Sequence, residues 1–335
     1  MRLNGDGQFR GKVGQRLVLV DLVRGLAIIG VVFYHLAWDL SFLGIVGVDV
    51  GRDPAWIAFA RVLAGSFVGL VGVSLVLAHH QGIRWGAFWR RIGILAAAAV
   101  AITAATLLTF PQTFIYFGIL HAIALFSVLA LPFLRAPTWV VMAGAALVFT
   151  VPVLFRSPTF NERWLAWIGL GTAPTPSNDF EPLFPWFGLV LLGIVIGRGL
   201  LSSRVATKLR WQPQAAFLRF LLTAGRQSLV IYLAHQPILL GILYPVVWIW
   251  PPDSTTVDAS FLQACRTSCV GTGESSATCQ SACDCSAREL KRAGLWSLVE
   301  QPQLTPDQRN RIDEAAKMCF GAAQRPIPGK GSTTR

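Results

Sequence analysis

Long apolar stretches separated by short polar ones make up the chain as far as residue 250. Seven of these stretches are close to the roughly 20 residues that cross a bilayer as a helix. They are residues 17–38, 55–78, 88–108, 113–133, 138–155, 183–198 and 227–250, of which the fifth and sixth are the shortest. The first stretch carries Asp21 and Arg24 and has no small-residue cleavage site, unlike a signal peptide. The pattern predicts an all-α fold, a polytopic membrane helical bundle of about seven transmembrane helices.

The composition agrees with a membrane protein. Of 335 residues, 53% are hydrophobic and 14% are charged, whereas soluble domains average about 25% charged residues. In a soluble protein the net charge of +12 would suggest a nucleic acid partner. In a membrane protein the same charge sets the orientation of the helices, and we expect no nucleic acid partner.

The basic residues lie mostly on one side of the predicted membrane. Only Arg52, Arg156 and Arg163 fall in the connections of the opposite side. Because basic loops stay in the cytoplasm, we expect a cytoplasmic amino terminus. We also expect a multi-pass protein of a bacterial inner membrane with a periplasmic carboxyl-terminal tail. The residues on the basic side are Arg2, Arg10, Lys12, Arg16, Arg84, Arg90, Arg91, Arg135, Arg198, Arg204, Lys208, Arg210, Arg219 and Arg226.

These features divide the chain into four segments. A cytoplasmic segment at 1–16 precedes the transmembrane domain at 17–250, and a cysteine-rich helical domain at 251–325 precedes a disordered end at 326–335. Within the cysteine-rich domain, Thr305 and Gln308 have the spacing of a capping box, and Pro306 occupies the first helical position. This predicts a last helix that runs to about Phe320.

All six cysteines follow the last apolar stretch, which supports an oxidising location for the tail. Cys265 and Cys269, and Cys279 and Cys283, are pairs at helical spacing on either side of a glycine turn. The simplest arrangement is a helical hairpin with nested disulfides Cys265–Cys283 and Cys269–Cys279, which leaves Cys285 for Cys319. Six cysteines allow fifteen pairings, so this is one of several possibilities. A zinc site is the alternative, although the tail has no histidine.

Ionisable residues inside a membrane span are costly and indicate function. The first stretch contains four, Asp21, Arg24, His35 and Asp39, which share one stripe at about 100° per residue. His35 and Asp39 are one helical turn apart, so the carboxylate can orient the imidazole as a general base. Arg24 is about 16 Å from His35 along the helix axis. Its guanidinium group could bind a phosphate, or it could form an ion pair with Asp21 that only anchors the end of the helix.

Other stretches contribute Arg61, His121 and His235 at graded depths across the predicted bilayer. For His121, a hydrogen bond between helices is an equally good interpretation. His79 and His80 are expected to face water at a helix end. Small-residue repeats at Gly65 and Gly69, and at Gly193 and Gly197, permit close helix packing.

The motifs around these residues resemble transmembrane acyltransferases. Arg24 and His35 reproduce the arginine, ten residues, histidine pattern of membrane acyltransferase family 3. The fuller set, which spans about residues 17–245, resembles bacterial relatives of heparan-alpha-glucosaminide N-acetyltransferase. That set comprises Trp38-Asp39-Leu40, Phe59-Ala60-Arg61, Phe117-Gly118-Ile119-Leu120-His121, Pro185-Trp186-Phe187-Gly188, Gly225-Arg226-Gln227-Ser228, and Tyr232 with His235-Gln236-Pro237.

The resemblance implies acetyl-CoA or another acyl-CoA as the cytoplasmic donor, an essential histidine, and a hydroxyl or amine acceptor, often of a sugar. His35 and Arg24 take the catalytic and supporting positions of family 3. In the heparan enzyme the essential histidine follows the first helix, where this chain offers none. These families usually have ten or more spans, so we expect either a shortened donor channel or a homo-oligomer that completes it.

The hypothesis is therefore a membrane acyltransferase without a metal. His35 would be the base, oriented by Asp39, with Arg61 or His121 stabilising developing charge. The donor-binding residues would be Arg24, Asp21, His235 and Arg226, and the partners membrane lipid and an extracytoplasmic glycan. The alternative is a transporter or proton pathway that uses the same arginine and histidine residues inside the membrane, although the two halves of the chain show no clear internal repeat. A third possibility is an assembly partner that acts through its tail.

Overall fold

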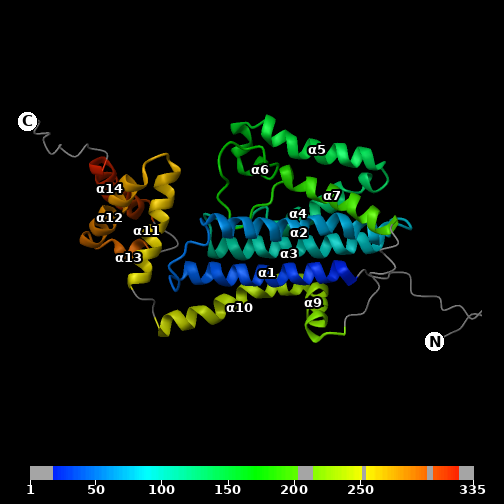
Figure 1. The fold of residues 1–335 in the computed structure, drawn as a ribbon, viewed down its shortest axis with the longest axis horizontal. Helices are drawn as coiled ribbons and strands as arrows, with labels where there is room; N and C mark the ends of the chain where they lie inside the picture. Colours follow the sequence, from blue (N-terminus) through cyan, green and yellow to red (C-terminus); the bar gives the residue numbers. More distant parts are fainter. Residues whose placement is uncertain (1–17, 203–213, 251–253, 300–304, 324–335) are drawn as a thin grey trace, which may run out of the picture. The chain divides into compact units, whose positions relative to one another are not determined.

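The computed structural model describes residues 18–202, 214–250, 254–299 and 305–323, which form helices and loops with no strand among them. Figure 1 shows the helices in their order along the chain. By its internal contacts the chain divides into two compact units. The first unit is Met1–Val31 with Arg61–Leu233, and the second unit is Val32–Ala60 with Ala234–Arg335. The cytoplasmic segment predicted at 1–16 and the end predicted to be disordered lie outside the described residues.

Among the described helices, five are long and apolar enough to cross a membrane. They are α1 (Val18–Phe42), α2 (Pro54–His79), α3 (Trp85–Thr109), α7 (Leu183–Ser202) and α10 (Ser228–Ile249). The two remaining apolar stretches form the shorter helices α4 (Ile119–Leu129) and α5 (Thr138–Leu154). Each of the seven predicted spans therefore contains a helix, but two of these helices are shorter than the seven-span prediction requires.

The short length of α4 has a local cause. The helix begins at Ile119 because Gly118 is extended and the Asp179 carboxylate accepts the Ile119 N–H at 2.9 Å. The residues before α4 pair instead with the loop before α7: Asn178 N–H donates to the Thr113 carbonyl at 2.8 Å. Eleven residues span only about 16 Å, about half of the hydrocarbon thickness.

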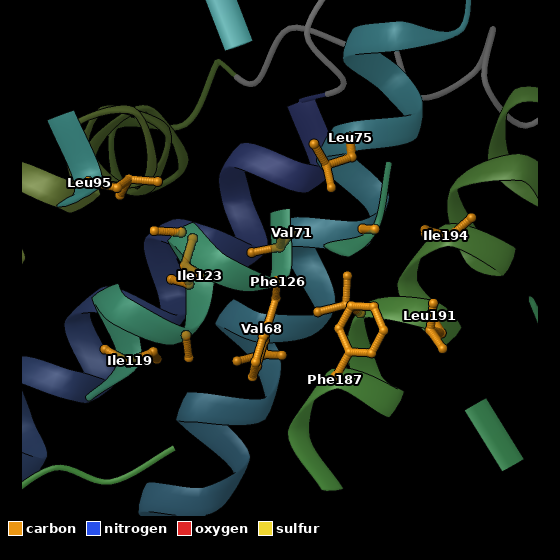
Figure 2. Close-up of a cluster of buried hydrophobic side chains, with 14 of the residues drawn as sticks. Val68, Val71, Leu75, Leu95, Ile119, Ile123, Phe126, Phe187, Leu191 and Ile194 are labelled. Atoms are coloured by element: carbon orange, nitrogen blue, oxygen red, sulfur yellow. The ribbon is translucent and has the colours of Figure 1, made fainter. Parts of the chain in front are cut away.

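The first unit is built around one apolar core (Figure 2). Val68, Val71 and Leu75 of α2 lie among residues of three other helices. These are Leu95 of α3, Ile119, Ile123 and Phe126 of α4, and Phe187, Leu191 and Ile194 of α7. On α5, by contrast, Trp139 and Val153 are exposed, as expected for a helix that faces lipid.

Close contact between α2 and α7 depends on glycine. A Cβ on Gly193 would collide with the Gly69 backbone, and a Cβ on Gly72 would collide with the backbone of Val190 and Ile194. Only glycine lets two helix backbones approach this closely. The packing role predicted for the small-residue repeats is confirmed at Gly193 and Gly197, whereas a Cβ on Gly69 would meet only an ordinary contact.

A second backbone contact joins α1 to α9 (Ala216–Arg226), the short helix that precedes α10. A Cβ on Gly25 would collide with the Leu221 carbonyl, and one on Gly225 would collide with the Asp21 carbonyl. The contact brings Arg226, the last residue of α9, to the same end of α1 as Asp21.

The cysteine-rich tail is a small helical domain of α11 (Ser254–Gly271), α12 (Ser276–Arg292), α13 (Trp296–Val299) and α14 (Pro306–Ala323). The three disulfides are Cys265–Cys283, Cys269–Cys279 and Cys285–Cys319, which is the predicted pairing. With all six sulfurs in disulfides, the cysteines are not available as zinc ligands. The predicted capping box is also confirmed, because Gln308 accepts from Thr305 N–H at 2.9 Å and donates its own N–H to Thr305 Oγ1 at 3.3 Å.

The α2–α7 contact gives a first testable prediction. Gly193→Ala should lower the midpoint of thermal unfolding of the purified protein in detergent, because overpacking typically costs about 1–3 kcal/mol. Gly93→Ala on α3 is the matched control, since a Cβ there meets no atom of the described residues within 4 Å. Alanine favours helix over glycine, so the control should leave the midpoint unchanged or raise it. Equal midpoints for the two variants would contradict the proposed close contact.

Candidate active site

The first unit contains an open cavity of about 730 Å³ between α1, α2, α3, α4, the end of α9 and the start of α10. Its wall combines basic and apolar side chains. The basic ones are Arg24, His80, Arg84, Arg90, Arg91 and Arg226, and the apolar ones include Val31, Phe67, Val71, Leu95 and Ile123.

The basic side chains gather at one end of the cavity. On α3, Arg90 and Arg91 precede Ile94 and Leu95, and on α1, Arg24 precedes Val31. The helix α2 runs toward the basic end, since its apolar cavity residues precede His80 in the chain. In the orientation predicted from the loops, the basic end is the cytoplasmic one.

One buried carboxylate serves two of these guanidinium groups. Asp21, which is 3% exposed, lies 3.5 Å from Arg24 Nη1 and 3.4 Å from Arg226 Nε. Arg24 Nη2 also donates to Ser74 Oγ at 2.9 Å. The predicted contact of Asp21 with Arg24 is therefore present. A single carboxylate cannot neutralise the whole group, and the basic end of the cavity keeps an excess of positive charge.

Acidic side chains lie near the opposite end of the cavity. Tyr232 and Ile119 line the cavity, and both contact Asp179 Oδ2: the tyrosine hydroxyl donates at 3.4 Å and the backbone N–H at 2.9 Å. Glu181 follows two residues later, and its Oε2 is buried without a hydrogen-bond partner among the described residues. Neither carboxyl group lines the cavity itself; Asp179 lies behind Ile119 and Tyr232, which do.

The two carboxyl groups hold protons more tightly than usual. Burial raises the pKa of Glu181 to about 9, and repulsion by Asp179 adds to this effect, while Arg61 acts against it. Burial also raises the pKa of Asp179, against the opposing effect of its two hydrogen-bond donors. Glu181 is therefore neutral at pH 7 and can donate a hydrogen bond.

His121 is held by protein groups on both ring nitrogens. Nδ1 accepts the Gly118 N–H at 3.3 Å, and Nε2 lies 3.3 Å from Thr103 Oγ1. The threonine hydroxyl donates to the Ile115 carbonyl at 2.7 Å, so the ring donates to the threonine oxygen. This geometry matches the alternative interpretation, in which His121 is a hydrogen-bonded group between helices.

The second unit contains three of the predicted residues, His35, Asp39 and His235, whereas Arg61 belongs to the first unit. The rings of His35 and His235 are 4.7 Å apart between centroids. Asp39, which is fully buried, accepts a hydrogen bond from Gln236 Nε2 at 2.6 Å. No hydrogen bond joins His35 to Asp39 among the described residues, and His35 Nδ1 is buried there without a partner. The predicted catalytic histidine thus lies beside a second histidine.

The structure brings the predicted residues together in part. Asp21, Arg24 and Arg226 line one cavity, whereas His35, Asp39 and His235 belong to the second unit. His79, expected to face water, has a buried Nδ1.

Sequence reasoning missed Asp179, Glu181 and Tyr232 as site residues. The two acids directly precede the apolar stretch that starts at residue 183, a place where an acidic residue is usually an ordinary loop charge. Tyr232 was quoted only as part of the acyltransferase-like motif with His235-Gln236-Pro237, and no role was predicted for its side chain.

Comparison with known families completes the description of the site. A family profile described as "Heparan-alpha-glucosaminide N-acetyltransferase, catalytic" matches residues 16–237. The match spans about two thirds of the chain and includes all of the residues described above. Comparison with curated proteins gave no match, and neither did comparison with solved structures.

The raised pKa of Glu181 predicts a pH-dependent stability. Between its ordinary value of 4.5 and about 9, the unfolded chain loses this proton while the folded protein keeps it. Stability should therefore fall as the pH rises through this window. Glu181→Gln cannot lose a proton, so its unfolding midpoint in detergent should exceed that of the wild type by a few degrees at pH 8.5 and by less at pH 5.5. Glu162→Gln, at an exposed position on the same side, should give no such difference. A constant offset at every pH would refute the assignment.

Proposed function

The chain belongs to the heparan-alpha-glucosaminide N-acetyltransferase catalytic family, and on that basis we propose that it moves an acetyl group across the membrane. The donor would be a cytoplasmic acyl-CoA, and the acceptor a hydroxyl or amine of an extracytoplasmic glycan. The observation that supports this function most directly is the cavity of the first unit, with basic groups at one end and an apolar wall beyond them.

The cavity matches the chemistry of a CoA thioester. CoA carries phosphate groups at one end of a long molecule and an uncharged thioester at the other. Arginine side chains bind phosphate through charge-assisted hydrogen bonds, and the arginines of the cavity stand at its basic end. The apolar residues between α1, α2 and α4 suit the uncharged arm, so the thioester would lie deepest.

The reaction replaces the C–S bond of the thioester by a C–O or C–N bond to the acceptor. The acceptor must lose a proton, and the leaving thiolate gains one. We assign the acceptor proton to His35, whose buried Nδ1 has no partner among the described residues. Asp39 lies one helical turn away and accepts a hydrogen bond from Gln236, and in the proposed reaction its charge would stabilise the protonated imidazole without a direct hydrogen bond.

Developing negative charge on the thioester oxygen needs hydrogen-bond donors. Glu181 is protonated at neutral pH because of its raised pKa, and a neutral carboxylic acid is such a donor. Arg61 provides a positive charge that acts on Glu181. His121, fixed through both ring nitrogens, would position the start of α4 rather than exchange protons.

Inside-out membrane vesicles that contain the protein provide the direct test. Acetyl-CoA labelled in the acetyl group is added outside the vesicles, which corresponds to the cytoplasmic side. Label should accumulate in material of the vesicle lumen, and free CoA should appear in equal amount. Consumption of no acetyl-CoA by folded protein, over a range of sugar acceptors, would refute the enzyme and favour the transporter alternative.

Arg90 tests the donor site. Arg90→Gln should raise KM for acetyl-CoA roughly tenfold, since a hydrogen bond to a charged group contributes about 1.5–3 kcal/mol. The kcat should change little, because the phosphate contact is the same in the ground state and the transition state. Arg135→Gln is the matched control: Arg135 is an exposed arginine that does not line the cavity, and its KM should remain at the wild-type value. An equal rise in both variants would point to general surface charge.

A substitution of His35 tests its proposed role as the general base. His35→Ala should lower kcat by about 10²–10⁴-fold, the usual contribution of a positioned general base. Binding of unreactive CoA to the same variant, measured by calorimetry, should stay close to that of the wild type. Full turnover in His35→Ala would exclude His35 as the base while leaving the family membership intact.

A further inference from the structure

The short helix α9 crosses the beginning of a membrane span. Its closest contact with α1 is at Gly25 and Gly225, where a Cβ added to either residue would collide with the backbone of the other helix. In Figure 1, α9 runs across the direction of α1. Because α1 is long and apolar enough to cross the bilayer, and Gly25 is only about 11 Å from its first residue, α9 lies near one surface of the membrane.

The length of α9 agrees with this position. The helix has 11 residues and is about 16 Å long, about half of the hydrocarbon thickness. A helix that crosses a span and is too short to be one itself lies along the membrane surface.

The side chains of α9 divide into an apolar and a basic exposed face. Phe217 and Phe220 are 65% and 60% exposed, and at about 100° per residue they are about 60° apart on the helix. Arg219 and Arg226 are also exposed, about 20° from each other and about 140° from the middle of the phenylalanine face. The remaining side is buried in the first unit and consists of Leu221, Leu222 and Ala224. An apolar and a basic face are typical of a helix in the membrane interface.

The charge around α9 has one sign. Between residues 198 and 227 the sequence has six basic residues and no acidic one. Within the part of the chain that the structure describes, the one ion pair of α9 joins Arg226 to Asp21 at 3.4 Å, and Asp21 also contacts Arg24. The exposed side of α9 therefore keeps a positive charge.

We propose that α9 is an interfacial helix that binds the head groups of anionic phospholipids at the basic end of the cavity. Phe217 and Phe220 enter the acyl-chain region, and Arg219, with Arg226 beside it, contacts lipid phosphates through charge-assisted hydrogen bonds. A negatively charged membrane surface attracts basic segments next to a span. In the orientation predicted from the loops, this surface belongs to the cytoplasmic leaflet, which carries anionic lipids.

A second copy of the chain is the other candidate for the exposed phenylalanine face. A two-fold dimer brings the same patch of both copies together. Two basic segments without an acidic residue would then meet, and their like charges oppose the contact. Anionic lipids, by contrast, complement this charge.

A lipid on α9 lies next to the opening of the cavity. Arg226 is the last residue of α9, and both Gly225 and Arg226 line the cavity. The crossing of α9 over α1 also holds Asp21 between Arg226 and Arg24. Lipids that fix α9 in the interface therefore fix this end of the cavity, and the bilayer composition should control its stability.

Spin labels in the full-length protein measure the position of α9. All six native cysteines are in disulfides, so Phe220→Cys or Arg219→Cys provides a single free thiol. In lipid nanodiscs the label at Phe220→Cys should collide mainly with oxygen, which partitions into hydrocarbon. The label at Arg219→Cys should collide mainly with a water-soluble nickel chelate. Leu147→Cys on the lipid-facing side of α5 and Glu162→Cys in an exposed loop are the references for hydrocarbon and water.

Two results would overturn the proposal. The first is equal access of the nickel chelate to both α9 labels, which would place α9 in water. The second is magnetic broadening of the Phe220→Cys spectrum by a second label nearby, which would assign the phenylalanine face to another copy of the chain.

Thermal unfolding in two kinds of nanodisc tests the choice of lipid. One kind contains phosphatidylcholine alone, and the other also contains phosphatidylglycerol, which should raise the unfolding midpoint of the wild type. Arg219→Gln should lose much of this difference, since one basic residue near an anionic surface contributes about fivefold to binding. Arg135→Gln, which removes an exposed arginine outside α9, should keep the difference.

An equal loss in the two arginine variants would point to general surface charge and overturn the assignment to α9. So would a wild type with the same midpoint in both kinds of nanodisc. Both experiments measure the protein without acetyl transfer, so their outcome is independent of the proposed function.

Discussion

The arrangement of the first unit depends on the Asp179 carboxylate at the amino end of α4. It accepts the Ile119 N–H at 2.9 Å and the Tyr232 hydroxyl at 3.4 Å. A carboxylate at this position also interacts favourably with the helix dipole, by about 0.3–1 kcal/mol or more when partly buried. Because Asp179 is 60 residues away in sequence, it ties the loop before α7 to the start of α4 and to α10. The late start of α4 then leaves Ile119 and Ile123 on the wall of the cavity.

Irregular backbone next to apolar helices is stable only when its polar groups are paired. Here two loops satisfy each other: Asn178 N–H donates to the Thr113 carbonyl at 2.8 Å, and Glu181 N–H donates to the Phe117 carbonyl at 3.2 Å. This pairing places Glu181, half-buried with its Oε2 covered, next to Asp179, and the proximity of the two carboxyl groups helps to raise the pKa of Glu181. The same contacts that stabilise the loops therefore create a neutral acid beside the carboxyl group that contacts Ile119 and Tyr232 of the cavity wall. The fold and the proposed chemistry share one cause.

The sequence predicted the features that depend on local pattern. Helix positions and the nested pairs Cys265–Cys283 and Cys269–Cys279 were predicted from periodicity and spacing, and the structure confirms them. The pair Cys285–Cys319 was what remained among several possible pairings, and the contact of Asp21 with Arg24 was one of two interpretations; both are present. It could not predict features that depend on contacts between distant segments. Hydropathy does not distinguish the short helix α4 from a full span, because the residues before Ile119 are as apolar as a helix that crosses the bilayer. His79 next to a terminal turn gives no sign that Phe88, nine residues later, covers its ring.

The polarity of the cavity favours the proposed enzyme over a carrier. A protein that carries a charged solute across the bilayer must favour that solute along its whole path. In the first unit the basic side chains lie at one end of the cavity, and the wall beyond them is mostly apolar as far as Ile119 and Tyr232, which contact Asp179. Under the proposed function, a phosphorylated donor would be held at the basic end and would have no favourable position beyond it. Only an uncharged part of the donor, such as an acetyl thioester, would enter the apolar part. The cavity would then let a small acyl group advance while the charged donor stays on its own side, as transmembrane acetylation requires.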